Sequence, residues 1–339
     1  MSNKNLLSGR DKELQELAEQ YEAAMSENKP FYQDADELAD LADWYGTKKR
    51  YDKAFEIAEY GLKLHPDSTE LMIEYAYLHL DNGKQAKARE IIENLPDTYS
   101  PEAKVVRAHL LLSEGKLDDA EQLLDTIEDK ADLANVVDVS YMYLDMGYPD
   151  KALAWLDPVK EEYSDEEAYI AVVADCLYGK GMTEEAIPLY NRLIDMNPYS
   201  APYWFGLARC HFEEMNFNQA IDACDYALVG DDEFADAYVM KGHCFYQLGN
   251  EDAALEYYQK AEELHGLAPE FIYTYIGLCK VSKGEWKEGY ENLEKAILEN
   301  ETDEIASPIL PSLYANAGLC LSKMGKKPKA HQYCKKAHK

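Results

Sequence analysis

Residues 201–234, APYWFGLARCHFEEMNFNQAIDACDYALVGDDEF, decide the fold of this chain. The first half repeats residues at the i, i+3, i+4, i+7 spacing of one helix face: Trp204, Leu207, Ala208 and His211. After a polar turn at residues 215–218, the second half carries another such face: Ala220, Ile221, Cys224, Ala227 and Leu228. Two such faces predict an antiparallel helical hairpin, with small residues at its crossing so that the backbones approach closely. One hairpin cannot bury both faces alone and therefore needs neighbours.

Equivalent positions recur along the chain, most often 34 residues apart. We call each set of equivalent positions a column. The Ala220 column reads Ala54, Ala88, Ala120, Ala152, Ala186, Ala220, Ala254, Gly289 and Ala330. The Ala208 column is also small throughout: Ala42, Ala76, Ala108, Ser140, Ala174, Ala208, Gly242, Gly277 and Gly318. The sequence thus predicts nine hairpins, each with small residues where its helices cross.

A glycine stands between these two columns in most units, where the first helix must stop. Glycine reaches the left-handed conformation that ends a helix without steric cost. These glycines are Gly83, Gly115, Gly147, Gly181, Gly249, Gly284 and Gly325. Units one and six have Lys49 and Met215 instead, so we expect their turns to be built differently.

The helix–turn–helix period and its residues make the chain resemble the tetratricopeptide repeat family. The residues that carry the resemblance are Trp204, Leu207, Ala208, Ala220, Ala227 and the unit-ending Pro66 and Pro198. The resemblance covers about residues 35–339. It implies an all-α fold, a right-handed α-solenoid of tandem helix–turn–helix units in which each unit packs on its neighbours.

The repeat sets the expected organisation of the chain. We expect a capping helix within residues 1–34, at 11–26, then units one to eight over 35–303. A connecting loop, 304–310, then leads to the ninth unit, 311–339. Pro158 lies inside the second helix of unit four, where it predicts a kink or an early helix end.

The composition is strongly acidic, with 65 acidic against 34 basic residues and a net charge of −31. Phosphate binding requires lysine and arginine, so nucleic acid and anionic membrane are poor partners, whereas a basic or neutral protein is allowed. The alternative is that the acid is a solvated face that keeps the chain soluble. Because the sequence shows no secretory signal or membrane-length apolar run, and has seven cysteines, we expect a soluble protein of the cytoplasm.

The resemblance implies that the residues equivalent to Pro202, Phe205, Arg209 and Phe212 face a concave groove formed by the first helices. The alternative is that some of these columns pack against neighbouring helices. From these columns we select ten candidate residues for partner binding: Tyr77, His109, Tyr141, Asp175, Tyr178, Phe205, Arg209, Phe212, His243 and Tyr246. Since residues 201–234 hold three of them, we expect the centre of recognition there.

The predicted groove is apolar and aromatic, with acid at its N-terminal rim from Asp36, Asp43, Glu70 and Glu102. The resemblance also suggests acidic chaperone tails as ligands, which require a clamp of cationic and amide side chains. Only Arg209 is cationic at these positions before the last unit, so the clamp is missing. The sequence therefore predicts a protein or peptide partner that is apolar or basic rather than an acidic tail.

Five consecutive units share a cysteine column: Cys176, Cys210, Cys244, Cys279 and Cys320. We interpret this column as small buried core residues, with a thiol or metal sensor as the alternative. His331, Cys334 and His338 share a helix face, but no tight metal-binding motif is present. We expect no metal and no cofactor.

The sequence contains no phosphate-binding loop, nucleophile elbow or zinc-protease motif, so we expect no enzyme. The favoured function is a protein interaction scaffold. The alternative is a structural assembler. Residues 322–339 carry seven lysines and no acid, and this end could dock on the acidic face of another copy to form a homo-oligomer.

Overall fold

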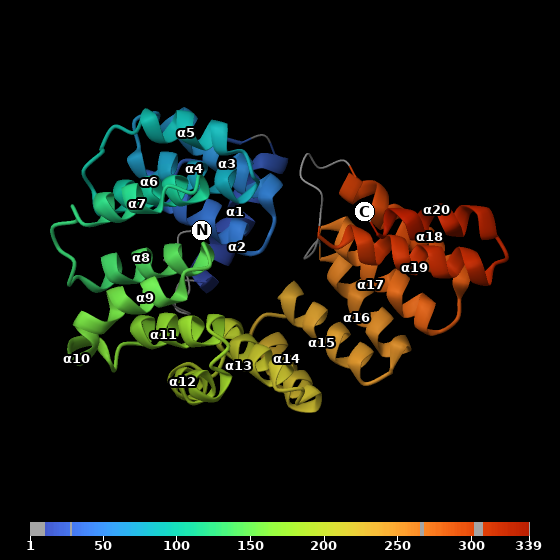
Figure 1. Ribbon diagram of the computed structural model, residues 1–339. Helices are drawn as coiled ribbons and strands as arrows, with labels where there is room; N and C mark the ends of the chain where they lie inside the picture. The colour runs from blue at the N-terminus through green and yellow to red at the C-terminus, as the bar shows by residue number, and fades with distance from the viewer. Residues whose placement is uncertain (1–10, 28, 265–267, 302–307, 339) are drawn as a thin grey trace. The chain divides into compact units, whose positions relative to one another are not determined.

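The computed structural model describes residues 11–27, 29–264, 268–301 and 308–338. These residues form helices joined by short turns, with no strand among them, as the sequence predicts (Figure 1). The chain divides into two compact units, Met1–Cys210 and His211–Lys339, here called the N-terminal and C-terminal units. Among the described helices, none combines the length and the apolar character that a membrane-spanning segment requires.

The N-terminal unit is a series of helical hairpins. The first helices of successive hairpins, α2, α4, α6, α8 and α11, contact one another in that order. The unit contains α1 (Asp11–Ser26), α2 (Ala35–Thr47), α3 (Tyr51–Leu64), α4 (Thr69–Asp81), α5 (Gln85–Glu93), α6 (Pro101–Ser113), α7 (Leu117–Leu124), α8 (Leu133–Asp145), α9 (Pro149–Leu156), the 3-10 turn η2 (Asp157–Val159), α10 (Lys160–Tyr163), α11 (Glu167–Gly179), α12 (Thr183–Met196) and the first part of α13 (Ala201–Glu213).

The C-terminal unit continues the same alternation from the end of α13. Each helix packs against the next one along the chain from α14 to α20. Its helices are α14 (Phe217–Gly230), α15 (Ala235–Gln247), α16 (Glu251–Glu263), α17 (Pro269–Ser282), α18 (Trp286–Glu301), α19 (Leu310–Lys323) and α20 (Lys327–Lys336). Residues 1–10, residues 304–307 of the expected connecting loop and Lys339 lie outside the described residues.

The two small-residue columns meet inside the hairpins. In unit four the Ser140 hydroxyl, fully buried, donates a hydrogen bond of 3.2 Å to the carbonyl oxygen of Ala152. In unit eight a Cβ atom on Gly289 would lie 3.4 Å from the carbonyl oxygen of Gly277. Larger side chains at these crossings would push the helices apart, so the recurrence of small residues has the structural cause that the sequence suggested.

The turns between the helices share one backbone conformation. All seven glycines of the turn column have positive φ, between 67° and 78°. The expectation that units one and six turn differently is wrong: Lys49 has φ 59° and Met215 has φ 58°. Their turns also keep the same hydrogen bonds, since the Met215 amide donates to Phe212 and the next amide to His211, as at the glycine turns. The packing of the two helices therefore dictates the turn, whichever residue occupies it.

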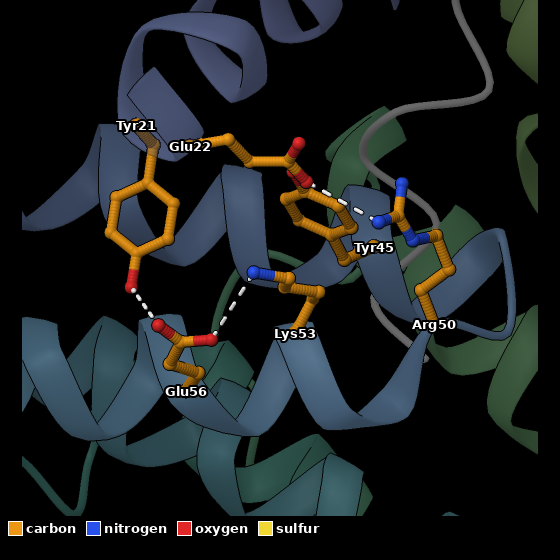
Figure 2. Close-up of polar contacts among 6 residues, drawn as sticks. All are labelled: Tyr21, Glu22, Tyr45, Arg50, Lys53 and Glu56. Carbon is orange, nitrogen blue, oxygen red and sulfur yellow. Dashed lines mark hydrogen bonds and ion pairs between the residues drawn. The ribbon is translucent and has the colours of Figure 1, made fainter. Parts of the chain in front are cut away.

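Helix α1 covers the exposed end of the first hairpin. Its apolar face is buried with the core of that hairpin through Leu14, Ala18 and Tyr21. Figure 2 shows polar contacts that accompany this packing: the Tyr21 hydroxyl donates to Glu56 on α3 at 3.2 Å, and Arg50 pairs with Glu22 of α1 at 3.3 Å. These contacts fix the helix against α3 and the turn that precedes it.

The second helix of unit four ends early, as Pro158 predicts. Helix α9 stops at Leu156, and the 3-10 turn that follows contains the proline. Proline lacks the N–H that would continue the helical ladder, and its ring clashes with the preceding turn. Pro188 is tolerated inside α12 near the helix start.

Candidate binding surfaces

A cavity of about 420 Å³ lies on the first helices of units one to four. We call it the acidic cavity because nine of the eighteen described residues that line it are Asp or Glu, and none of these eighteen is Lys or Arg. The lining residues come from α2, α4, α6, α8 and the loop before α6. They are Asp36, Ala39, Asp40, Asp43, Thr69, Glu70, Ile73, Glu74, Tyr77, Asp97, Ser100, Glu102, Val105, His109, Asp138, Tyr141, Met142 and Asp145. Such a lining favours a positively charged occupant.

Three of the candidate residues form part of the acidic cavity. Tyr77, His109 and Tyr141 are each less than a tenth exposed, and the ring centres of Tyr77 and His109 lie 5.7 Å apart. Burial lowers the pKa of His109 to about 4. The His109 ring is therefore neutral at pH 7, and its Nδ1 atom has no hydrogen-bond partner among the described residues. Burial also raises the pKa values of both tyrosines.

Glu74 also lines the acidic cavity, although it does not belong to any of the columns from which the candidates were selected. Its side chain is only 4% exposed, and none of the residues that the structure describes forms a hydrogen bond or an ion pair with it. Burial, and then repulsion from Asp43, raises the pKa of Glu74 well above its usual value. The signal was present in the sequence: the column of Gly206 is acidic in units one, two and four, as Asp40, Glu74 and Asp138.

Four further candidates form one cluster around Asp175 of α11. The Asp175 carboxylate accepts hydrogen bonds from Arg209 at 2.7 Å and from Tyr141 at 3.3 Å. The guanidinium of Arg209 also lies over the rings of Tyr178, at 4.4 Å, and Phe205, at 5.5 Å. Burial alone would lower the pKa of Arg209, but Asp175 outweighs it and raises the pKa. Neighbouring residues of the N-terminal unit therefore already pair with Arg209, the one cation that the sequence predicted for the groove.

Tyr190 completes this cluster from the second helix α12, which the groove columns did not include. Its hydroxyl donates to Asp175 at 2.7 Å, and Arg209 donates to the same hydroxyl at 3.3 Å. The cluster therefore joins α8, α11, α12 and α13 within the N-terminal unit, and its contacts stabilise the hairpins.

The remaining candidates, Phe212, His243 and Tyr246, lie together in the C-terminal unit. They line a second cavity of about 300 Å³, which we call the aromatic cavity. Its lining residues are Phe212, His243, Tyr246, Gln247, Tyr258, Tyr275 and Leu278. None of these side chains carries a charge at neutral pH, since burial lowers the pKa of His243 to about 4. This cavity suits an aromatic or aliphatic side chain.

The side chains that line the aromatic cavity are fixed by contacts with one another. His243 forms a hydrogen bond of 2.8 Å from Nδ1 to the Tyr258 hydroxyl and meets the Tyr275 ring edge-on at 4.5 Å. Tyr258 and Tyr275 stack with their centres 5.1 Å apart. The Tyr246 hydroxyl is 3.3 Å from the Ser282 hydroxyl. Two lining residues were not among the candidates. Tyr258 lies on α16, the second helix of its unit, and Tyr275 belongs to the Gly206 column, which was not one of the groove columns.

The cysteine column forms part of the core. Cys176, Cys210, Cys244, Cys279 and Cys320 have no exposed surface. Burial raises the pKa values of Cys176, Cys244 and Cys279 to about 12, so these thiols are poor nucleophiles at neutral pH. In the part of the chain that the structure describes, no three His, Cys, Asp or Glu side chains are arranged to hold a metal ion.

Two lysines of the basic C-terminal end interact within their own unit. Lys329 pairs with Glu294 at 3.1 Å, and Lys336 donates to the Tyr314 hydroxyl at 3.0 Å. These contacts tie α20 to α18 and α19. They reduce the positive charge that this end can offer to another copy of the chain.

Comparison with family models gives two matches. Residues 47–108 match a tetratricopeptide repeat model, and residues 179–261 match the model for anaphase-promoting complex, cyclosome, subunit 3. A search of curated proteins found no significant match.

Several solved structures share the fold. A chain of the APC/C hetero-tetramer Cut9–Hcn1 aligns with a TM-score of 0.50 at 15% identity, over 90% of this chain and 80% of that one. A tetratricopeptide repeat protein from Parabacteroides merdae aligns with a TM-score of 0.50 at 18% identity, over 72% and 98%. Human IFIT1, in its dimer with PPP-AAAA, aligns with a TM-score of 0.50 at 12% identity, over 90% of each chain. At these identities the likeness concerns the fold alone.

Proposed function

Because the chain belongs to the tetratricopeptide repeat family, we propose that it is a non-enzymatic scaffold whose first helices receive a peptide segment of a partner protein. The observation that carries the proposal is the acidic cavity. Its described lining comes mainly from the first helices of four consecutive units, and among these described residues are nine carboxylic acids and no lysine or arginine. A repeat protein that only needed solubility would not require these acids in a recess between helices.

The two cavities, one in each unit, favour different kinds of side chain. The acidic cavity favours basic side chains, and the aromatic cavity favours an apolar anchor, which binds by removing its surface from water. An acidic tail would meet repulsion in the acidic cavity, and none of the described residues that line the aromatic cavity offers it a cation. The proposal therefore keeps the preference for apolar and basic segments.

Catalysis has no support in the chemistry of these cavities. A histidine whose pKa is about 4, as for His109 and His243, is a weak general base at neutral pH. The buried thiols have raised pKa values and are shielded from substrate. We therefore assign binding alone.

A peptide display library tests the proposal. We expect the full chain to enrich peptides that contain basic and aromatic or aliphatic residues and few acids. A Phe212→Ala, Tyr246→Ala double variant should lose the preference for an apolar anchor, since both side chains line the aromatic cavity. The control is Tyr99→Ala with Tyr199→Ala, because these exposed side chains line neither cavity. If the full chain enriches no peptide, the proposal is wrong.

A further inference from the structure

The acidic cavity contains a carboxylic acid in an unusual setting. Glu74 is 4% exposed, lines the cavity and has no hydrogen-bond or ion-pair partner among the described residues. Burying a carboxylate is unfavourable unless a cation or several donors surround it. Asp43, itself 3% exposed, adds a second acid close enough to repel it. An amide or an apolar residue would suit the fold better, so the acid at this position needs another explanation.

A second group that lines the acidic cavity also lacks a hydrogen-bond partner among the described residues. The neutral His109 ring, 8% exposed, lines the same cavity with its Nδ1 atom unused by any described residue. Ile73 and Tyr77, which lie beside Glu74 on α4, add an aliphatic and an aromatic wall. A ligand with a cationic tip and an apolar stem would pair with Glu74 and pack against both walls.

We propose that the acidic cavity is a recognition site for a lysine side chain of a partner peptide, with Glu74 as the carboxylate that receives the ammonium group. The proposal rests on the peptide-binding function above and names its specificity. The lysine stem lies against Ile73 and Tyr77, and neighbouring acids such as Asp145 raise the local attraction for the cation.

Lysine fits this site better than other cations. A compact ammonium group has three donors that can turn toward carboxylates on different helices, whereas arginine requires a planar, two-pronged partner. An aromatic wall also stabilises a cation that leaves water. A metal ion is a poorer occupant, because no three ligating side chains of the described chain are suitably arranged.

The test uses the full chain and the best lysine-containing dodecapeptide from the display selection. Its affinity is measured by calorimetry beside the same peptide with acetylated lysine, which keeps the stem and removes the charge. On the wild type, acetylation should weaken binding by about tenfold to a hundredfold, the range for a charge-assisted hydrogen bond. On Glu74→Gln, acetylation should weaken binding much less than on the wild type, since the receiving charge is gone and only the neighbouring acids still attract the ammonium group.

Two further variants make the result specific. Glu185→Gln changes the same charge on the exposed face of α12 and should keep the full effect of acetylation. Asp145→Asn removes an exposed cavity acid with little risk to the fold and should weaken the lysine peptide more than its acetylated form. Free spermidine should not displace the peptide at equal concentration, because it lacks the apolar and polar contacts of the chain.

The outcomes separate this inference from the proposed function. If the wild type selects peptides but Glu74→Gln remains as sensitive to acetylation as the wild type, the lysine site is wrong and peptide binding stands. Selection of peptides without lysine would also refute the lysine site and leave peptide binding intact. If the wild type selects no peptide at all, both proposals fail together. An arginine peptide that binds as tightly as its lysine form would overturn the assignment of lysine.

Discussion

The ring of Tyr190 on α12 packs directly against the backbone of Gly206 on α13: a Cβ atom built on Gly206 would lie 2.2 Å from Cε1 of the ring. The ring is only 2% exposed, and its hydroxyl is fixed by a hydrogen bond to Asp175. The glycine therefore makes room for the tyrosine that completes the Asp175 cluster.

Replacing this glycine should destabilise the protein. Alanine favours helix more than glycine, yet we expect Gly206→Ala to lower the free energy of unfolding by about 1–3 kcal/mol through overpacking. Urea titration followed by circular dichroism measures the change. Gly46→Ala is the matched control: its new Cβ would lie 3.4 Å from Leu78, so stability should hold or rise by about 0.5–1 kcal/mol. Equal stability of both variants would show that Tyr190 can move aside.

Met215 should be a stabilising position for glycine. Its φ of 58° places a side chain in the left-handed region, which costs about 1–2 kcal/mol relative to glycine. Glycine would remove this cost, but its greater freedom in the unfolded chain offsets part of the stabilisation. We therefore expect Met215→Gly to raise the free energy of unfolding by about 1 kcal/mol. Thermal and urea unfolding measure it. Asn191→Gly, at an exposed position in the middle of α12, is the control and should destabilise the protein. A loss of stability in Met215→Gly would contradict the shared-turn interpretation.

The buried histidine of the acidic cavity should make stability depend on pH. Because the pKa of His109 falls to about 4 on folding, the unfolded chain takes up a proton first as the pH drops below about 6.5. Stability from this group is complete above that pH and is lost progressively toward pH 4. His109→Gln should therefore lose less stability than the wild type between pH 7 and pH 4.5, by about 2 kcal/mol.

Paired urea titrations at the two pH values measure this difference. The cavity carboxylic acids act in the opposite direction, since their raised pKa values let the folded chain bind protons first. They are present in both proteins, so the comparison cancels their effect to a first approximation. His331→Gln, on the exposed face of α20, should behave like the wild type. Identical pH dependence of His109→Gln and the wild type would refute the prediction.

The seven thiols should react in two classes. Cys334 is exposed, whereas the other six cysteines are buried. We expect one thiol to react rapidly with Ellman's reagent in the native protein and the other six to react only on unfolding. Cys334→Ser should abolish the rapid phase. A second rapid thiol in protein that keeps its helical circular dichroism signal would count against the core role of the cysteine column.

The regular part of the architecture could be predicted from the sequence because it depends on single columns. Small residues at the crossings, glycine at the turns and proline at position 158 each act through local sterics, which are the same in every unit. The approximate positions of the helices can be predicted from these columns. The turn at Met215 was misjudged because the column suggests that glycine is required, whereas the packing of the helices imposes the same backbone on any residue.

The candidate sites were less predictable because they depend on contacts between columns. Arg209 was singled out as the only cation of the groove positions before the last unit, yet it is paired with Asp175, one repeat earlier in the sequence. Glu74 was missed because its column reads as core in other units, for example Val172 and Gly206. A column shows which face a residue occupies, whereas its charge partner depends on side chains from two or three helices.

The common turn conformation has a consequence for how such a chain can evolve. Nine turns in the described chain place a residue at positive φ, and two of them do so without glycine. A duplication or loss of one whole repeat in the coding sequence would therefore need no new turn and no new helix crossing. The number of repeats is then free to follow the length of the surface that a ligand requires, while folding imposes little limit on it.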